Sequence, residues 1–292
     1  MVYNHFEFKY IDLHCHFFPP NIFQAIWNYF ELPDDQGNIR GWPIKYKLPT
    51  VELVQFLESK NVEAFTTYNY AHKRGVANFI NEWVNDFTKE YKNALAFGCV
   101  SPEDKDRVEY IIKIFDVYNF YGIKLQLLVQ NFYPYDERMF KIYDIILDRG
   151  KWINFHVGTA PYSNRYVGYK NFLKFIEKYP NMKVIIAHLG TYEFEKFFSI
   201  LNKYEHIFLD TTMVYINLNL FQKWKKKVKI PNPELLLSYE DRLFYGSDFP
   251  NIPYDYEFST KGLLELDLPK NFYKKIFYDN AKRVFKLSQF ST

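Results

Sequence analysis

Short runs of apolar residues recur along the chain, and each is followed by a longer segment in which apolar residues repeat at helical spacing. Such runs are typical of buried strands, and the segments between them are long enough for amphipathic helices. The pattern predicts strands over residues 8–14, 62–68, 94–100, 122–128, 152–157, 183–188, 206–210 and 242–246. It predicts helices over residues 22–30, 78–91, 105–118, 136–149, 171–179, 192–204 and 272–287.

Eight strands alternating with helices favour an α/β fold, a closed (β/α)8 TIM barrel, in which all strands run parallel. The whole chain, residues 1–292, then forms one domain, because barrels of this length are common. The first interval is the longest, and residues 18–60 form a loop and helix insertion. Because this insertion follows the first strand, we expect it to lie over the barrel mouth. The last helix, 272–287, is expected to pack on the outside.

Polar residues stand at one end of five predicted strands, the C-terminal end at which barrel active sites are built. These residues are His14 and His16 on the first strand, Lys124 on the fourth, His156 on the fifth, His188 on the sixth and Asp248 on the eighth. His14 and His16 are two residues apart, so their side chains point to the same side of an extended backbone. Each residue alone has an ordinary interpretation: a core histidine, a capping aspartate or a lysine that reaches solvent. Together, at one rim of one barrel, they indicate a metal site.

Composition narrows the class of protein. Hydrophobic residues make up 48% of the chain and aromatic residues 21%, enough for a large core and an aromatic-walled site. A formal net charge of +3 predicts neither nucleic acid nor a membrane as partner. The densest basic run, residues 223–229, is interpreted as the solvated face of a helix end. Aromatic-rich outer helices are compatible with a homodimer.

The two cysteines, Cys15 and Cys99, are too few for a disulfide framework and fall in apolar runs, as buried reduced thiols do. The first residues lack the pattern of a signal peptide, and no apolar run approaches membrane-spanning length. We therefore expect a cytoplasmic protein that acts on a small molecule.

With these residues in place, the sequence resembles the amidohydrolase superfamily. It is most similar to the amidohydrolase-related (amidohydrolase 2) branch, which also contains aminocarboxymuconate-semialdehyde and resorcylate decarboxylases. The ordered set of matching segments is specific and spans nearly the whole chain. The segments are residues 11–20, 122–125, 155–159, 187–190, 209–212, 243–250 and 279–285.

The resemblance implies a role for each residue at the strand ends. His14, His16 and His156 match the imidazole ligands of the metal. Asp248 matches the aspartate that binds the metal or orients its water, and His188 matches a histidine that contacts this water. Three nitrogens and a carboxylate suit one zinc ion with an open position, and they also tolerate manganese or iron.

Lys124 on the fourth strand leaves open whether the site binds one metal ion or two. Elsewhere in the superfamily a lysine at this position can be carbamylated and bridge two ions. Lys124 is therefore a candidate bridge to a second metal, with His188.

This site predicts a metal-dependent hydrolase in which a metal-activated water attacks a carbonyl centre of an amide, lactone or ester. Asp248 would act as general base and then acid, and His188 would hold the water or stabilise the oxyanion. The alternative is a lyase, a metal-dependent non-oxidative decarboxylase of a small aromatic or unsaturated carboxylic acid. Lys124 and Arg165 are candidates to orient the carboxylate, and Trp42 is a candidate to cover the substrate.

Two further functions receive less support. A barrel that binds metal and ligand without turnover is disfavoured because all five metal-site positions carry competent residues. A nuclease is disfavoured by the lysine on the fourth strand and by the near-neutral charge.

Overall fold

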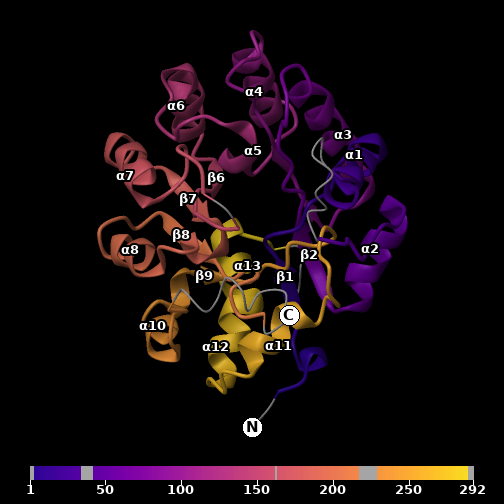
Figure 1. Cartoon of the computed structure of the whole chain (residues 1–292), viewed down its shortest axis with the longest axis vertical. Coiled ribbons are helices and arrows are strands. Elements are labelled where there is room, and N and C mark those ends of the chain that lie inside the picture. Colours follow the sequence, from indigo (N-terminus) through magenta and orange to yellow (C-terminus); the bar gives the residue numbers. More distant parts are fainter. Residues whose placement is uncertain (1–2, 34–41, 162, 217–228, 289–292) are drawn as a thin grey trace.

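Parallel strands surrounded by helices make up the fold in the computed structural model, which describes residues 3–33, 42–161, 163–216 and 229–288 (Figure 1). The strands are β1 (Tyr10–Asp12), β2 (Val62–Thr66), β3 (Ala94–Leu95), β4 (Phe97–Gly98), β5 (Gly122–Gln126), β6 (Trp152–His156), β7 (Lys183–Ile186), β8 (Ile207–Asp210) and β9 (Leu243–Phe244). They form two sheets, β1-β2-β3 and β4-β5-β6-β7-β8-β9, in which every neighbouring pair is parallel. Because the strands are buried on both faces, they appear in the sequence as nearly continuous apolar runs.

β3 and β4 belong to one interrupted strand. Only Ala96 separates them, and its carbonyl accepts a hydrogen bond of 2.9 Å from the backbone N–H of Tyr121, the residue before β5. On the other side, the N–H of Thr67 donates to the Leu95 carbonyl over 3.2 Å. The two sheets are therefore continuous through this strand.

The remaining gap closes between β9 and β1. The N–H of Leu13 donates to the Tyr245 carbonyl over 3.0 Å, and Cys15 forms a parallel bridge with Phe249. The described residues thus form a closed barrel, and the predicted fold is confirmed.

Helices form the outer layer (Figure 1). They are α1 (Pro20–Glu31), α2 (Thr50–Ser59), α3 (Ala77–Glu90), α4 (Arg107–Asp116), α5 (Leu127–Gln130), α6 (Phe140–Asp148), α7 (Tyr169–Lys178), α8 (Phe194–Ser199), α10 (Pro233–Ser238), α11 (Phe258–Leu264), α12 (Lys270–Lys274) and α13 (Asn280–Phe285). α3 shows why they form, because it buries Ile80, Val84 and Phe87 on one stripe. α2 is a helix that the sequence pattern did not single out.

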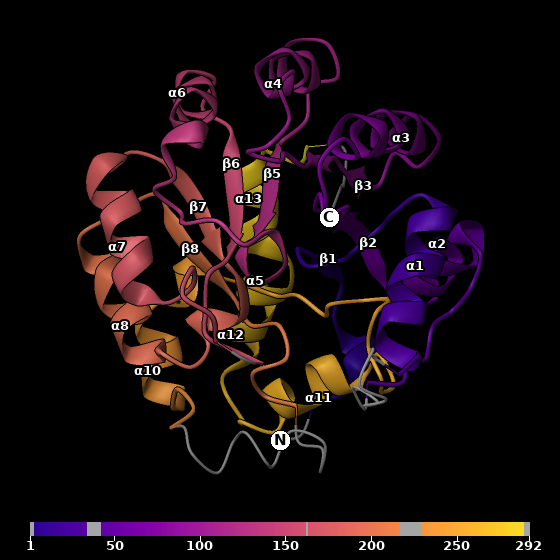
Figure 2. The ribbon, with the colours of Figure 1, turned by 45° about the horizontal axis from the view of Figure 1, so that its top comes forward.

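The last helical segment was expected on the outside of the barrel, and this expectation is wrong for α13. The Phe285 ring lies 5.2 Å from the ring of Trp152, the first residue of β6, and 6.1 Å from that of Phe244. Both belong to an apolar cluster between the strands, and α13 reaches in behind β5 and β6 in Figure 2. The helix closes the N-terminal end of the barrel because its aromatic face finds more apolar surface there than outside.

The insertion, residues 18–60, contains α1 and α2, which lie next to each other at the rim (Figures 1 and 2). The indole N–H of Trp42 donates to the Asn251 carbonyl over 2.8 Å, and the N–H of Lys45 donates to the Ile252 carbonyl over 2.9 Å. Part of the insertion is thus joined to the loop that follows β9. Whether it covers the barrel mouth stays a prediction.

Two other expectations concern the surface. The basic run 223–229 lies outside the described residues except for Lys229, whose Nζ lies 4.0 Å from Glu195 Oε1. Among the helices that the structure describes, none has the length and apolar character needed to span a membrane. The cytoplasmic location and the homodimer stay predictions.

Candidate metal centre

Three predicted ligands meet at the C-terminal ends of β1 and β9. Oδ1 of Asp248 lies 2.8 Å from Nε2 of His16 and 3.3 Å from Nε2 of His14. The three ligand atoms all lie within 4.8 Å of one another. The closure of the barrel produces this arrangement, since β1 and the chain after β9 run side by side. Residues more than two hundred positions apart thereby form one cluster.

The hydrogen bonds made by the two histidines show which nitrogen of each ring carries a proton. His16 Nδ1 donates to the Tyr68 carbonyl, and His14 Nδ1 donates to Oδ2 of Asp210 over 2.9 Å. In each neutral ring Nε2 is then an acceptor. Burial and the nearby Lys124 ammonium lower the pKa of His14 to about 3, so its ring is neutral.

The Asp248 carboxylate completes a group of converging acceptors. Burial alone would raise its pKa, but a hydrogen bond from His16 Nε2, which this nitrogen donates when it carries a proton, lowers the pKa well below the usual range. A neutral His16 Nε2 and a carboxylate oxygen 2.8 Å apart repel unless a cation lies between them, either a proton or a metal ion. Two imidazole nitrogens and one carboxylate oxygen are a suitable donor set for a divalent ion. The residues present therefore fit the metal that the sequence predicts.

Asp210, at the end of β8, is a residue of this centre whose role the sequence analysis missed. Its Oδ2 accepts the His14 hydrogen bond, and its Oδ1 accepts from the backbone N–H groups of His188 at 2.9 Å and Thr212 at 3.3 Å. Burial opposes ionisation, but His14 lowers the pKa of Asp210 below its usual range, so the side chain is a carboxylate. The signal was present in the sequence, because Asp210 is also a polar residue at the end of a predicted strand.

The backbone is unusual at two of these positions. His188 has φ 55° and Asp248 has φ 71°, in the left-handed region that few residues other than glycine adopt. Gly246 is required nearby, because a Cβ atom there would lie 2.2 Å from Thr212 Oγ1 and 2.5 Å from His14 Cβ. Backbone conformations of this kind gather at functional sites.

His188 and His156 lie beside the three converging residues. The His188 ring centroid is 4.9 Å from that of His14 and 4.7 Å from that of His156. His156 Nε2 donates to the Ala160 carbonyl over 3.0 Å, and Nδ1 accepts from Gln126 Nε2 over 2.9 Å. Both nitrogens of His156 thus already have partners, and to bind metal it would have to exchange one. Its role as a ligand stays a prediction.

Lys124 is buried on β5 and contacts a proposed ligand. Its Nζ donates to Asn154 Oδ1 over 2.6 Å and to His14 Nε2 over 3.3 Å, and it lies 5.3 Å from the centre of the Tyr68 ring. Burial lowers the pKa of Lys124 to about 8, although Asp210 opposes the shift. The structure therefore brings Lys124 to the centre. Carbamylation and a second metal stay predictions.

The two other predicted substrate-binding residues lie in loops. Arg165 is exposed, donates from Nη2 to the Tyr166 hydroxyl over 2.7 Å, and stacks on that ring at 4.8 Å. Trp42 is half-buried and fixed to the Asn251 carbonyl. Contact of either residue with a substrate stays a prediction.

A closed (β/α)8 barrel with a candidate metal centre at the C-terminal ends of its strands defines the class of protein. Within this class the chain belongs to the amidohydrolase family, because a family model described as amidohydrolase matches residues 11–287. The resemblance found in the sequence is thus confirmed. No curated protein matches the chain.

Solved structures share the fold over almost the entire chain. One is 5-carboxyvanillate decarboxylase from Novosphingobium aromaticivorans, with manganese and 4-hydroxy-3-methoxy-5-nitrobenzoic acid; it is 15% identical with a TM-score of 0.63 and covers 96% of both chains. A 2,6-dihydroxybenzoate decarboxylase from Rhizobium is 14% identical with a TM-score of 0.63, covering 96% of this chain and 99% of that chain.

A third structure is a probable 2-pyrone-4,6-dicarboxylic acid hydrolase from Acinetobacter baumannii with bound citric acid. It is 14% identical with a TM-score of 0.66 and covers 95% of this chain and 99% of that chain. Identities this low establish the fold alone. The neighbours include decarboxylases and a hydrolase, so the family does not by itself define the reaction.

Proposed function

We propose that this protein is a metal-dependent hydrolase that acts on a carbonyl centre of a small molecule, an amide, lactone or ester. The observation that carries the proposal is the convergence of three acceptors, Nε2 of His14, Nε2 of His16 and Oδ1 of Asp248. His156 is the fourth proposed ligand. One zinc ion suits these donors, and manganese is the metal in the decarboxylase structure described above.

When bound, such an ion would polarise the carbonyl and lower the pKa of a water molecule beside it. Asp248 is ionised and would accept the proton of this water and return it to the leaving group. His188 donates from Nδ1 to the Thr212 carbonyl over 3.1 Å, so its Nε2 is an acceptor that would orient the water. Asp210 would hold the His14 ring in the orientation that presents Nε2 to the metal.

Non-oxidative decarboxylation is the second candidate, and Lys124 is the observation that favours it. The buried ammonium group of Lys124, 3.3 Å from a proposed metal ligand, would hold a substrate carboxylate, and its hydrogen bond to Asn154 would orient it. Two of the structural neighbours described above are decarboxylases of hydroxylated benzoates or vanillates.

Two measurements test these proposals. Protein purified without chelator is analysed for metal content, and zinc-loaded and manganese-loaded samples are then assayed on lactone, ester and amide substrates and on carboxylic acids. Hydrolysis without release of carbon dioxide supports the first candidate, and release of carbon dioxide from an acid supports the second. Absence of a divalent ion, together with unchanged activity in His14→Ala, would overturn both.

A further inference from the structure

A basic loop follows β2 at the end of the barrel that carries the metal centre. Residues 72–74 are His72, Lys73 and Arg74, and all three are exposed in the loop between β2 and α3. This loop has no role in the proposed mechanism. We refer to residues 72–74 as the basic loop.

The segment between β2 and the basic loop contacts both metal-centre histidines. The carbonyl of Tyr68 accepts from His16 Nδ1, and the Tyr68 ring lies 5.2 Å from that of His14. The Tyr70 ring lies 6.0 Å from that of His16. Four residues of extended chain span at most about 14 Å, so the backbone of Arg74 lies within that distance of Tyr70. The basic loop therefore lies at the C-terminal end of the barrel, within that distance of a residue whose ring contacts His16.

The end of the basic loop is fixed to the barrel. The N–H of Gly75 donates to Oδ1 of Asp104 over 2.7 Å, and the Tyr110 hydroxyl donates to Oδ2 of Asp104 over 3.2 Å. Asp104 is only 3% exposed. Both carboxylate oxygens are thus held by uncharged donors, and this anchoring restricts where the basic loop can move.

The positive charges of the basic loop are available to a ligand. Other lysines of the described chain are paired with carboxylates, such as Lys47 with Glu31 at 2.6 Å and Lys60 with Glu257 at 2.5 Å. Across the described ranges, no recorded ion pair includes Lys73 or Arg74. Lys73 and Arg74 are thus two cations without an acidic partner at this end of the barrel, and together they attract an anion.

We propose that Lys73 and Arg74 bind a terminal oxyanion group, carboxylate or phosphate, that the substrate carries away from its reacting atom. The inference rests on the proposed function, because that function places the reacting end of the substrate at His14, His16 and Asp248. The guanidinium of Arg74 can hold such a group with two parallel hydrogen bonds, and the Lys73 ammonium adds charge. The substrate class is then a small molecule with two functional ends, one of them an anion.

The test uses metal-loaded full-length protein and measures binding by calorimetry. The probes are dicarboxylates from glutarate to azelate, monocarboxylates of equal length, and the matching phosphonocarboxylates. The wild-type protein should bind the best dianion about 10-fold more tightly than the equal-length monocarboxylate, the value of one charge-assisted contact. Preference for the phosphonocarboxylate over the dicarboxylate would identify the anion as phosphate-like.

The decisive variant is Lys73→Gln/Arg74→Gln, in which the dianion preference should fall to about 1 while monocarboxylate affinity is unchanged. The matched control is Lys89→Gln/Lys92→Gln, which removes two exposed lysines at and beyond the opposite end of α3. Circular dichroism checks that both variants are folded. A wild-type protein without the preference, a loop variant that retains it, or a control that loses it would overturn the inference. Elemental analysis of the same samples tests the proposed metal function separately.

Discussion

The two ends of the barrel contribute to stability in opposite ways. At the C-terminal end, acceptors of His14, His16 and Asp248 face one another, and the backbone of His188 and of Asp248 adopts a left-handed conformation. At the N-terminal end, Phe285 and Trp152 fill the barrel with apolar rings. The first arrangement costs stability until a cation binds, and the second supplies stability without any ligand.

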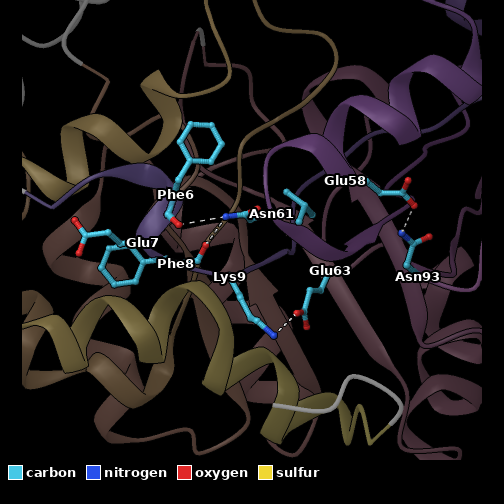
Figure 3. Close-up of a pocket in the computed structure, with 9 residues that line it drawn as sticks. Phe6, Glu7, Phe8, Lys9, Glu58, Asn61, Glu63 and Asn93 are labelled. Atoms are coloured by element: carbon cyan, nitrogen blue, oxygen red, sulfur yellow. Dashed lines mark hydrogen bonds and ion pairs between the residues drawn. The ribbon is translucent and has the colours of Figure 1, made fainter.

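The surface of the N-terminal end also differs from the metal centre, because its polar groups are already paired. A hollow of about 670 Å³ lies beside the first residues of β1 and β2 (Figure 3). Its polar groups already have partners: Lys9 Nζ lies 2.7 Å from Glu63 Oε1, and Asn93 donates to Glu58 over 3.1 Å. The volume of a hollow is therefore a poor guide to function here. The acceptors that face one another mark the functional end.

The largest expected effect is a loss of metal affinity at the C-terminal end, in the variants His14→Ala and His16→Ala. Each substitution removes one of the two converging nitrogens. Loss of a residue that only hydrogen-bonds a metal ligand lowers metal affinity by up to about 100-fold, so loss of a ligand itself should lower it by more. Equilibrium metal titration measures it. His206→Ala, at an exposed position, is the control and should bind metal normally. Normal metal uptake in both histidine variants would contradict the site.

The matching change at the N-terminal end is Phe285→Ala. Phe285 is 6% exposed, so its loss should lower the free energy of unfolding by about 3–5 kcal/mol. Metal affinity of the folded variant should stay within about 2-fold of wild type, because the cavity lies at the other end of the barrel. Urea denaturation and metal titration measure the two quantities. A large loss of metal affinity would show that the two ends are coupled.

Asp210→Asn tests the support behind the metal ligands. The carboxylate accepts hydrogen bonds on both oxygens, from His14 on one and from the His188 backbone on the other. An amide has one accepting oxygen, so one of these donors must lose its partner. Metal affinity should fall about 10- to 100-fold. Asp144→Asn, on the exposed face of α6, is the control, and equal affinity in both variants would remove Asp210 from the centre.

The barrel and half of the metal centre follow from local sequence signals. Buried parallel strands read as short apolar runs, and His14 and His16 are close together in the sequence at the end of one. Asp248 could be added because the ends of parallel strands in a barrel meet at one rim. These inferences need only the direction of each strand.

The features that the sequence did not reveal depend on how distant side chains pack. An apolar helical stripe predicts that one face of a helix is buried. It does not predict that this face closes the N-terminal end of the barrel, as that of α13 does. The orientation of His156 depends on Gln126 and on the Ala160 carbonyl, neither of which carries a motif. The function of Asp210 likewise appears only when its two oxygens are seen with their donors.

The smallest expected effect concerns the pH dependence of stability at the N-terminal end, where His5 is buried. Its Nε2 donates to the Lys60 carbonyl over 3.0 Å, so Nδ1 accepts from the Thr260 hydroxyl over 2.9 Å. Burial lowers the pKa of His5 below 6.5, although the Lys60 carbonyl opposes the shift. The folded state then binds fewer protons than the unfolded state. His5 therefore contributes its full stability above pH 6.5, and this contribution is lost as the pH falls toward its folded pKa.

His5→Gln tests this contribution. Between pH 6.5 and the folded pKa of His5, the unfolding free energy of wild type should fall more steeply than that of the variant, by at most about 1.4 kcal/mol per pH unit. Urea denaturation at a series of pH values measures the difference between the two proteins, which removes the titration of the metal-centre histidines from the comparison. His206→Gln, at an exposed position, is the control for the substitution itself. Parallel curves for wild type and His5→Gln would mean that a buried neutral histidine does not stabilise the N-terminal end, and that its apolar packing alone accounts for the contrast with the metal centre.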